Sequence, residues 1–496
     1  MHAIKRLLRP QSLLSAALVA ALGGCSLAPT YHKPAIAIPA AFKESTGMWQ
    51  PAQPGDQLPR GDWWTIYGNS TLNGLEAQLN QANPTLATML ARYDSARAFE
   101  SQLSSGLFPQ VGVQASPEND RQSVNRVFRG RNQPNESDNN VLSFSAGYEL
   151  DLWGRVRNEV AAGRAEAEAA DADMASVTLS LQAQLADMYI QLQGYDIQAK
   201  ILDDSIKAYQ QALTLTQARF AGEIASQLDV ARAKSQLDDA QAQASEVSAQ
   251  RALAEHAIAS LVGQPASSFS LPAAPVALHV PAIPLSVPST LLQRRPDIAA
   301  AERRTFAANA EIGVARAAFF PSLSINAVAG WQNTNNGSLL TAANRFWALG
   351  PLAMLPLFDG GLRKAQERQA KANLDMAAGE YRSLVLSAFQ HVEDNLSLLN
   401  HLGREAQQEG DAAAAAQQAQ DIATNRYREG TVNYLEVVTA QTTTLMAERN
   451  TEQVRTRQLQ ASVNLIRALG GGWDGTMTSV PAHAATTKGD RIAQAG

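Results

Sequence analysis

The chain has 496 residues, a formal net charge of −5 and a single cysteine. One cysteine excludes an internal disulfide, and a mean hydropathy of −0.20 without a long apolar run excludes a bundle of transmembrane helices. The length alone would suit two or three soluble domains, since a single core stops growing near roughly 250–300 residues. If the protein enters a bilayer, it does so through β-strands or a lipid. The mild acidity gives no clustered basic surface, so we expect no nucleic acid among its partners.

The N-terminus has the pattern of an export signal. Several cations precede an apolar stretch, residues 13–22, that is too short to span a membrane. This stretch runs into Leu-Gly-Gly before Cys25, which resembles the bacterial lipoprotein box. We therefore expect residues 1–24 to be a lipoprotein signal peptide. Cys25 is then the lipid attachment site, carrying diacylglycerol and an N-acyl chain, and we expect no other cofactor. Ser26 in place of Asp favours sorting to the outer membrane.

The rest of the chain is a duplicated unit. Phe108-Pro109 recurs as Phe320-Pro321 at an offset of 212, and Arg219-Phe220 recurs as Arg426-Tyr427 at an offset of 207. The length difference between the halves falls in two polar stretches, 117–140 and 332–345, which we expect to be surface loops. The predicted order is a signal peptide (1–24), a lipidated N-terminal extended segment (25–68), a first repeat (69–263), a Pro-rich linker (264–288), a second repeat (289–473) and a flexible tail (474–496).

Each repeat is predicted to contain a helix, a strand, a loop, a strand, a long helix, a turn and a helix. Apolar and polar residues alternate over four stretches: 111–115, 142–152, 323–331 and, interrupted by two prolines, 346–357. Such alternation fits an ordinary half-buried strand and also a tilted transmembrane strand of about eleven residues. The flanking polar loops favour the transmembrane strand.

Heptad spacing of apolar residues predicts long helices with coiled-coil packing. One seam runs from residue 181 to 213 and a second from 374 to 399, and each has a further apolar set beside it. Each long helix should therefore contact two neighbours. The predicted helices of the first repeat and of the start of the second cover about 154–218, 227–262 and 290–318. Four strands per chain are too few to close a membrane barrel, which usually needs at least about eight, so the strands require an oligomer.

Several motifs carry a family resemblance. They are Trp63-Trp64, Arg294-Arg295-Pro296-Asp297, Phe319-Phe320-Pro321-Ser322 and Pro356-Leu357-Phe358-Asp359-Gly360-Gly361. Together they resemble TolC-type outer-membrane efflux proteins, and more closely the lipoprotein branch that includes OprM. The resemblance covers nearly the whole mature chain and makes both repeats outer-membrane efflux repeats. It implies a mainly α fold with membrane β: a trimeric α-barrel continued by a 12-stranded outer-membrane β-barrel.

The resemblance also implies a function and partners. The chain would be the outer-membrane channel of a tripartite efflux pump, lipid-anchored in the outer membrane and extending into the periplasm. As a homotrimer it would conduct drugs or other small toxic compounds from an inner-membrane pump of the RND type through a periplasmic membrane-fusion adaptor. Metal-cation efflux and a duct for type I protein secretion are alternatives within this class. A non-conducting, lipid-anchored periplasmic coiled-coil scaffold is a further alternative from a different class.

Two features depart from the family pattern. The usual Asp-Pro after the double Trp is Asn69-Ser70, and Gly222 lies one residue earlier in its turn than Gly430 does in the second repeat. The second departure predicts that the two turns at the helix tips are not equivalent. We assign the tip turns and the adaptor contact to six residues: Arg219, Phe220, Gly222, Arg426, Tyr427 and Gly430. The two arginines lie where a helix C-terminus favours cations, and a structural pairing or a locking role remains open for them.

The residues that follow the tip turns are candidates for a periplasmic aperture, because a duct that is always open would leak solutes. Asp229 and Glu436 occupy matching positions, and Tyr434 and Leu435 could close the bore. Three copies of Glu436 would form a negative ring that favours cations. Alternatively, both carboxylates start the following helices, where negative charge is favourable. The two interpretations remain open.

Enzymatic activity finds no support in the motifs. The sequence has no phosphate-binding loop ending in Lys-Ser/Thr, no His-Glu-x-x-His and no Gly-x-Ser-x-Gly. The seven histidines are scattered, and His391 and His401, ten residues apart, do not share one helix face. We therefore expect neither catalysis nor a metal site.

Overall fold

A computed structural model describes residues 26–44, 61–125, 134–281, 283, 294–334 and 337–471. The chain divides into two compact units, and both repeats contribute to each. Unit 1 comprises residues 1–35, 92–170 and 300–382, and unit 2 comprises 36–91, 171–299 and 383–496. The predicted lipid site, Cys25, lies outside the described residues.

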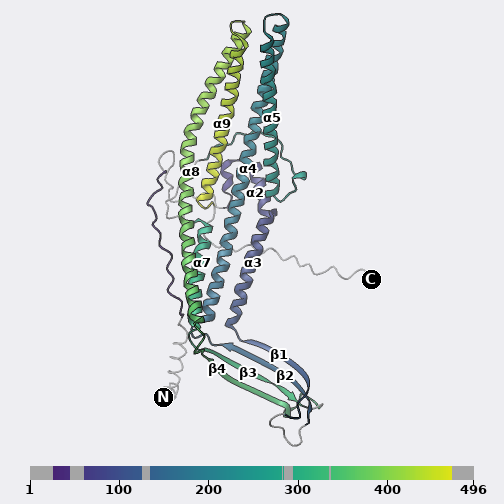
Figure 1. Cartoon of the computed structure of the whole chain (residues 1–496), viewed down its shortest axis with the longest axis vertical. Coiled ribbons are helices and arrows are strands. Elements are labelled where there is room, and N and C mark those ends of the chain that lie inside the picture. Colours follow the sequence, from purple (N-terminus) through teal and green to yellow (C-terminus); the bar gives the residue numbers. More distant parts are fainter. Residues whose placement is uncertain are drawn as a thin grey trace, which may run out of the picture. The chain divides into compact units, whose positions relative to one another are not determined.

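Unit 1 contains a four-stranded antiparallel sheet in the order β1-β2-β3-β4. The strands are β1 (Gln110–Arg121), β2 (Glu136–Glu149), β3 (Ser322–Asn333) and β4 (Arg345–Met354). Each repeat supplies one hairpin, and the pairing of β2 with β3 joins the two repeats (Figure 1). The sheet therefore has β1 and β4 as its edges, and each edge strand contains a proline, Pro117 or Pro351, as edge strands tolerate.

The register places the alternating apolar residues of β1, β2 and β3 on one face together with Trp347 and Leu349 of β4, whereas Leu352 and Met354 of β4 lie on the other face. Val113 pairs with Phe144, Phe144 with Ala329, and Ala329 with Trp347. Side chains two residues away repeat the pattern because successive residues of a strand point to opposite faces. Large apolar side chains on this face are exposed in the single chain: Val111, Val113, Phe144, Ile325, Trp347 and Leu349. The predicted alternation is thus confirmed for β1, β2 and β3, and Trp347 and Leu349 continue this face onto β4.

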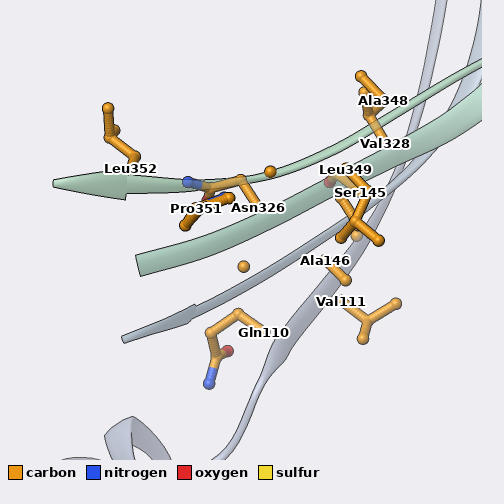
Figure 2. Close-up of a pocket in the computed structure, with 14 residues that line it drawn as sticks. Gln110, Val111, Ser145, Ala146, Asn326, Val328, Ala348, Leu349, Pro351 and Leu352 are labelled. Atoms are coloured by element: carbon orange, nitrogen blue, oxygen red, sulfur yellow. The ribbon is translucent and has the colours of Figure 1, made fainter. Parts of the chain in front are cut away.

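A hollow of about 810 Å³ lies against this sheet near the end where β1 begins and β4 ends. All four strands line it, and half of its residues are glycine, alanine or serine, among them Ala146 and Ala348 (Figure 2). Val111 and Leu349 add aliphatic side chains, while Asn326 adds a polar one. The hollow is an open, mostly apolar depression that brings no catalytic set of side chains together.

Two predictions about the strands need correction. The stretch 117–140 is not all loop: β1 continues to Arg121 and β2 begins at Glu136, so polar residues at both ends of that stretch are paired. Their pairing includes side-chain bonds, such as Ser137 Oγ donating to Asp120 Oδ1 at 2.8 Å. The fourth stretch forms the predicted strand, with Pro351 accommodated on a sheet edge, but β4 ends at Met354 and not at Leu357.

The two long helices, α4 (Arg155–Ala221) and α8 (Leu362–Arg428), have 67 residues each and contribute to both units. The other α-helices are α2 (Ser70–Ala82), α3 (Pro84–Ser104), α5 (Gln227–Leu261), α7 (Pro296–Ala317) and α9 (Tyr434–Ala468). The start expected for α7 near residue 290 lies outside the described residues. Across the part of the chain that the structure describes, no helix has both the length and the apolar character needed to cross a membrane.

The N-terminal region is only partly extended. Residues 63–67, predicted to belong to an extended segment, form the 3-10 helix η1 (Trp63–Tyr67), which buries Trp63, Trp64 and Tyr67. Asn69 then caps α2 by accepting a hydrogen bond from the Leu72 N–H at 2.9 Å. Asn and Asp are comparable N-caps, so this departure from the family pattern keeps the helix start intact.

In unit 1 the segment after Cys25 is attached to helices. Ser26 Oγ donates to Asn158 Oδ1 on α4 at 2.9 Å, and Asn309 on α7 donates to the Pro29 carbonyl at 2.8 Å. Gly313 lies so close to this segment that a Cβ there would be 2.8 Å from Ala28. Unit 1 therefore holds the residues that follow Cys25 against its own helices.

Unit 2 buries the predicted seam of α4 between helices. The buried seam residues are Leu185, Leu192, Leu202, Tyr209 and Leu213 on α4, and Val385, Val392 and Leu399 on α8. Toward the helix tips Leu202, Tyr209 and Leu213 join one cluster that also includes Ala233, Leu237, Tyr427, Tyr434 and Val437. Coiled-coil packing in this unit is thus confirmed.

The duplication extends to tight backbone contacts in unit 2. Gly263 has φ +73°, and a Cβ there would lie 2.4 Å from the Ala82 carbonyl oxygen. In the second repeat Gly470 has φ +93°, and a Cβ would lie 2.7 Å from the Arg294 carbonyl oxygen. The two pairs are related by the offsets 207 and 212 found in the sequence. Both positions need glycine for conformation and for space.

Candidate functional site

The two tip turns connect α4 to α5 and α8 to α9, and both lie in unit 2 (Figure 1). At the first tip the Ile224 N–H donates to the Arg219 carbonyl at 2.8 Å, and the Glu223 N–H to the Phe220 carbonyl at 3.0 Å. Residues 207 positions later repeat this pattern, with Thr431 donating to Arg426 at 3.0 Å and Gly430 to Tyr427 at 2.9 Å. Both helices end in a Schellman motif. The prediction that the two turns differ is therefore wrong for the backbone.

The residue in the left-handed position is what differs between the turns. Gly430 has φ +78°, and its counterpart Glu223 has φ +57°, the sole non-glycine residue with positive φ in the described part of the chain. Gly222 has an ordinary backbone and is therefore not the counterpart of Gly430. A side chain in this conformation costs about 1–2 kcal/mol. Glu223 was missed by sequence reasoning, although the offset of 207 already aligns it with Gly430.

The carboxylates after the turns have different partners. Asp229 forms a capping box: its N–H donates to Ser226 Oγ at 3.2 Å, and its Oδ2 accepts from the Ser226 N–H at 3.1 Å. At the second tip Asn433 makes no side-chain cap bond, and Glu436 lies in the first turn of α9. The helix-start interpretation thus describes Asp229, while Glu436 remains half exposed.

The two arginines are equivalent in sequence and differ in their contacts. Arg219 donates from Nη1 to the Tyr427 carbonyl at 2.7 Å and from Nη2 to the Arg428 carbonyl at 2.9 Å. Its guanidinium also lies 4.3 Å from the centroid of the Tyr427 ring. Arg426 instead pairs with Glu436 across 3.7 Å, with both side chains about half exposed. Arg219 therefore links the first tip to the end of α8, whereas Arg426 remains at the surface.

The aromatic residues at the second tip pack inside unit 2. Tyr434 is 1% exposed, and its ring centroid lies 5.3 Å from that of Tyr427. Its hydroxyl has no hydrogen-bond partner among the described residues, and burial raises the pKa of Tyr434. A side chain buried within its own chain cannot close a bore, so Tyr434 is a packing residue in this conformation. Leu435 and Phe220, by contrast, are exposed.

Comparison with known proteins agrees with this architecture. The profile of the family described as outer membrane efflux protein matches residues 75–264 and 287–471. The toluene efflux pump outer membrane protein TtgC and the antibiotic efflux pump outer membrane protein ArpC, both from Pseudomonas putida, are each 32% identical over 469 residues. Each alignment covers 93% of this chain and 96% of the relative.

Solved structures show the same fold. The outer-membrane channel OprN matches with a TM-score of 0.83 and 30% identity, over 91% of this chain and 100% of that one. The open state of the MtrE outer membrane channel of Neisseria gonorrhoeae matches with a TM-score of 0.81 and 25% identity, over 92% of this chain and 100% of that one. The duplicated helix and strand unit is therefore a known channel fold. Because the family profile matches most of both repeats, the chain belongs to the outer membrane efflux protein family.

Proposed function

We propose that this protein is the outer-membrane channel of a tripartite efflux system. It assembles as a homotrimer and conducts small toxic compounds, delivered by an inner-membrane RND-type pump and a periplasmic adaptor, to the cell exterior. The observation that carries the proposal is the apolar face of the sheet, which continues in register over four strands and is exposed in the single chain. An apolar face of this extent needs lipid or another protein against it.

The sheet edges support an oligomer. β1 and β4 each have a neighbour on one side, and unpaired edges within lipid would leave backbone groups without partners. Three chains with four strands each supply twelve strands, enough to close a barrel with a water-filled interior. The continuous apolar face then lies against lipid, and the long helices extend into the periplasm.

A lipid on Cys25 fits the position of the residues that follow it. Ser26 is bonded to Asn158, four residues into α4, and α4 begins six residues after the end of β2. The polypeptide leaving Cys25 therefore runs beside the helix that follows a membrane strand. A diacylglycerol and N-acyl anchor at Cys25 would enter the same membrane as the strands.

The aperture is assigned to Leu435 and Glu436, with the tip turns as the adaptor contact. Leu435 and Glu436 are both about half exposed at the start of α9. Three copies of Glu436 would form a negative ring, which favours cations. Asp229 lies at the matching level, but its capping bonds hold it to the helix start.

The proposed substrate class is based on the compounds for which two relatives are named. Two relatives are named for toluene and antibiotic efflux, so we propose small, largely apolar toxic compounds as the exported class. The hollow on the sheet of the described residues is open and has few polar groups, so it offers no enclosed site for such compounds. Selection of the compound would then belong to the inner-membrane pump.

Two measurements test the proposal. Purified protein should run as a heat-resistant trimer and conduct ions in planar bilayers, and Glu436→Ala should change single-channel conductance or cation selectivity. Unchanged values for both would remove Glu436 from the aperture. Deletion of the gene should raise drug susceptibility, and the full chain should reverse that effect together with its pump. Absence of both trimers and conductance would overturn the channel and favour a scaffold.

A further inference from the structure

One aromatic contact joins the two repeats at the end of the sheet. Trp153 follows β2 and Phe320 precedes β3, and their rings stack with centroids 4.7 Å apart and an interplanar angle of 26°. Trp153 Nε1 also donates to the Pro321 carbonyl at 2.8 Å. Since β2 and β3 are hydrogen-bonded neighbours, this contact closes the end of the junction between repeats.

The equivalent positions at the outer edges of the sheet, just before β1 and just after β4, carry aromatic residues that do not stack on another ring of the described residues. Phe108 precedes β1 at the offset of 212 that relates it to Phe320, and it is 66% exposed. The connector after β4 carries Leu357 and Phe358, which are 89% and 91% exposed. In the first repeat, the corresponding connector after β2 carries Trp153. The chain therefore exposes one aromatic residue at each edge of the sheet.

These exposed residues lie at the same end of the sheet. Gln110, the first residue of β1, pairs with Gly147 near the end of β2, and Ser322, the first residue of β3, pairs with Met354, the last of β4. If β4 of one chain lies beside β1 of the next, as β2 lies beside β3, Phe358 and Phe108 come together. Pro117 and Pro351 each remove a backbone donor from an edge strand, which gives more weight to contacts beyond the strand ends.

We propose that Phe358 of one subunit stacks on Phe108 of the next subunit, repeating between chains the contact that Trp153 and Phe320 make within a chain. Leu357 covers the rim of this contact. The occupant of the exposed aromatic surface is thus a second copy of this chain. The inference rests on the proposed homotrimer and adds to it a specific contact that joins the subunits. Burial of two aromatic rings that are open in the single chain stabilises the closed ring.

The test uses pairs of cysteines in the full chain, purified as the assembled oligomer in detergent. In F108C/F358C, a short fluorogenic cross-linker with two thiol-alkylating groups, such as dibromobimane, should join separate chains and give covalent dimers and trimers after denaturation. The matched control W153C/F320C should react equally but remain monomeric, because both thiols belong to one chain. Subunits carrying F108C alone, mixed with subunits carrying F358C alone, should give cross-linked dimers.

Single variants provide a second measurement if the double variant fails to assemble. In the oligomer, the F358C thiol should react with a maleimide more slowly than in the heat-dissociated chain, because the next subunit covers it. Equal reaction rates would mean that no neighbouring subunit covers this position, and would overturn the inference. Intact oligomers without interchain cross-links, alongside a reacting W153C/F320C control, would also overturn it while leaving the channel standing. Absence of wild-type oligomers would instead overturn the proposed function.

Discussion

Residues 219–229 at the first tip and 426–436 at the second share the two hydrogen bonds of a Schellman motif, but their side chains make different contacts. The first tip is bound to the rest of unit 2 by Arg219 and closed by the capping box of Asp229. It keeps Glu223 in a strained conformation. The second has a glycine at that position, no side-chain cap and an exposed ion pair, Arg426 with Glu436.

This difference indicates that equivalent turns of a duplicated chain can have different roles, one making contacts within the chain and the other remaining available to a partner. The charged side chains of the first tip, Arg219 and Asp229, are bonded within the chain. Their counterparts at the second tip, Arg426 and Glu436, remain about half exposed, where a neighbouring subunit, an adaptor or a permeating ion can meet them. Four predictions test this division. Three of them compare a residue with its counterpart 207 positions away, and the fourth compares two tyrosines of the second tip.

The largest effect is expected for the arginines. Arg219→Ala removes two charge-assisted hydrogen bonds and a cation–π contact, so the free energy of local opening at both tips should fall by about 2–3 kcal/mol. Arg426→Ala removes only an exposed ion pair, so it should change the free energy of local opening by less than about 1 kcal/mol. Hydrogen exchange of peptides covering both tips measures the two values. Equal effects would remove the proposed division.

The second-largest effect is expected for the carboxylates Asp229 and Glu436, whose removal should change the opening of the following helix by different amounts. Asp229→Ala removes the capping box, so the first turn of α5 should open more readily by about 1 kcal/mol, while Asp229→Asn keeps an acceptor and loses less. Glu436→Ala should alter the opening of α9 by less than about 0.5 kcal/mol. The same exchange experiment reports both. A larger effect of Glu436→Ala would assign that residue a structural role.

Substitutions at the residue with positive φ, Glu223 or Gly430, should change the stability of the two turns in opposite directions. Glu223→Gly should stabilise the first turn by about 1 kcal/mol, because glycine adopts positive φ without steric cost. Gly430→Ala should destabilise the second turn by a similar amount. Amide exchange at Ile224 and Thr431, the donors of the two motifs, measures the change. If Glu223→Gly weakens the turn, the side chain of Glu223 must make a contact that outweighs the strain.

The smallest effect is expected for the tyrosine hydroxyls. Tyr434→Phe removes a buried hydroxyl that has no partner among the described residues, so stability should stay within about 0.5 kcal/mol or rise. Tyr427→Phe breaks the hydrogen bond between the Tyr427 hydroxyl and Thr216 Oγ1, which lie 3.3 Å apart. This change should lower the free energy of unfolding by about 0.5–1 kcal/mol. Thermal unfolding of the purified oligomer compares them. A clear loss in Tyr434→Phe would show that its hydroxyl acts between subunits.

Much of the fold followed from local pattern. Heptad spacing identified the seams of α4 and α8, and alternation located the cores of the strands, because both periodicities arise from the geometry of one element. The ends of β1 and β2 were missed, since residues such as Asp120 and Glu136 are polar and are held by their partner strand rather than by burial. Residues 63–67 were missed for a related reason: their helix is one short turn that exists to bury three aromatic side chains.

The sequence by itself determined the duplication, the export signal pattern, the helix and strand types and the family resemblance, because each of these is written in the order and spacing of residues. It also aligned Asp229 with Glu436 and Arg219 with Arg426. Only the tertiary structure decided that Arg219 reaches α8 while Arg426 stays exposed, and that Tyr434 is buried. The physical reason is that equal positions in the two repeats have unequal neighbours: Arg219 meets the backbone at the end of α8, whereas Arg426 meets Glu436 of its own repeat.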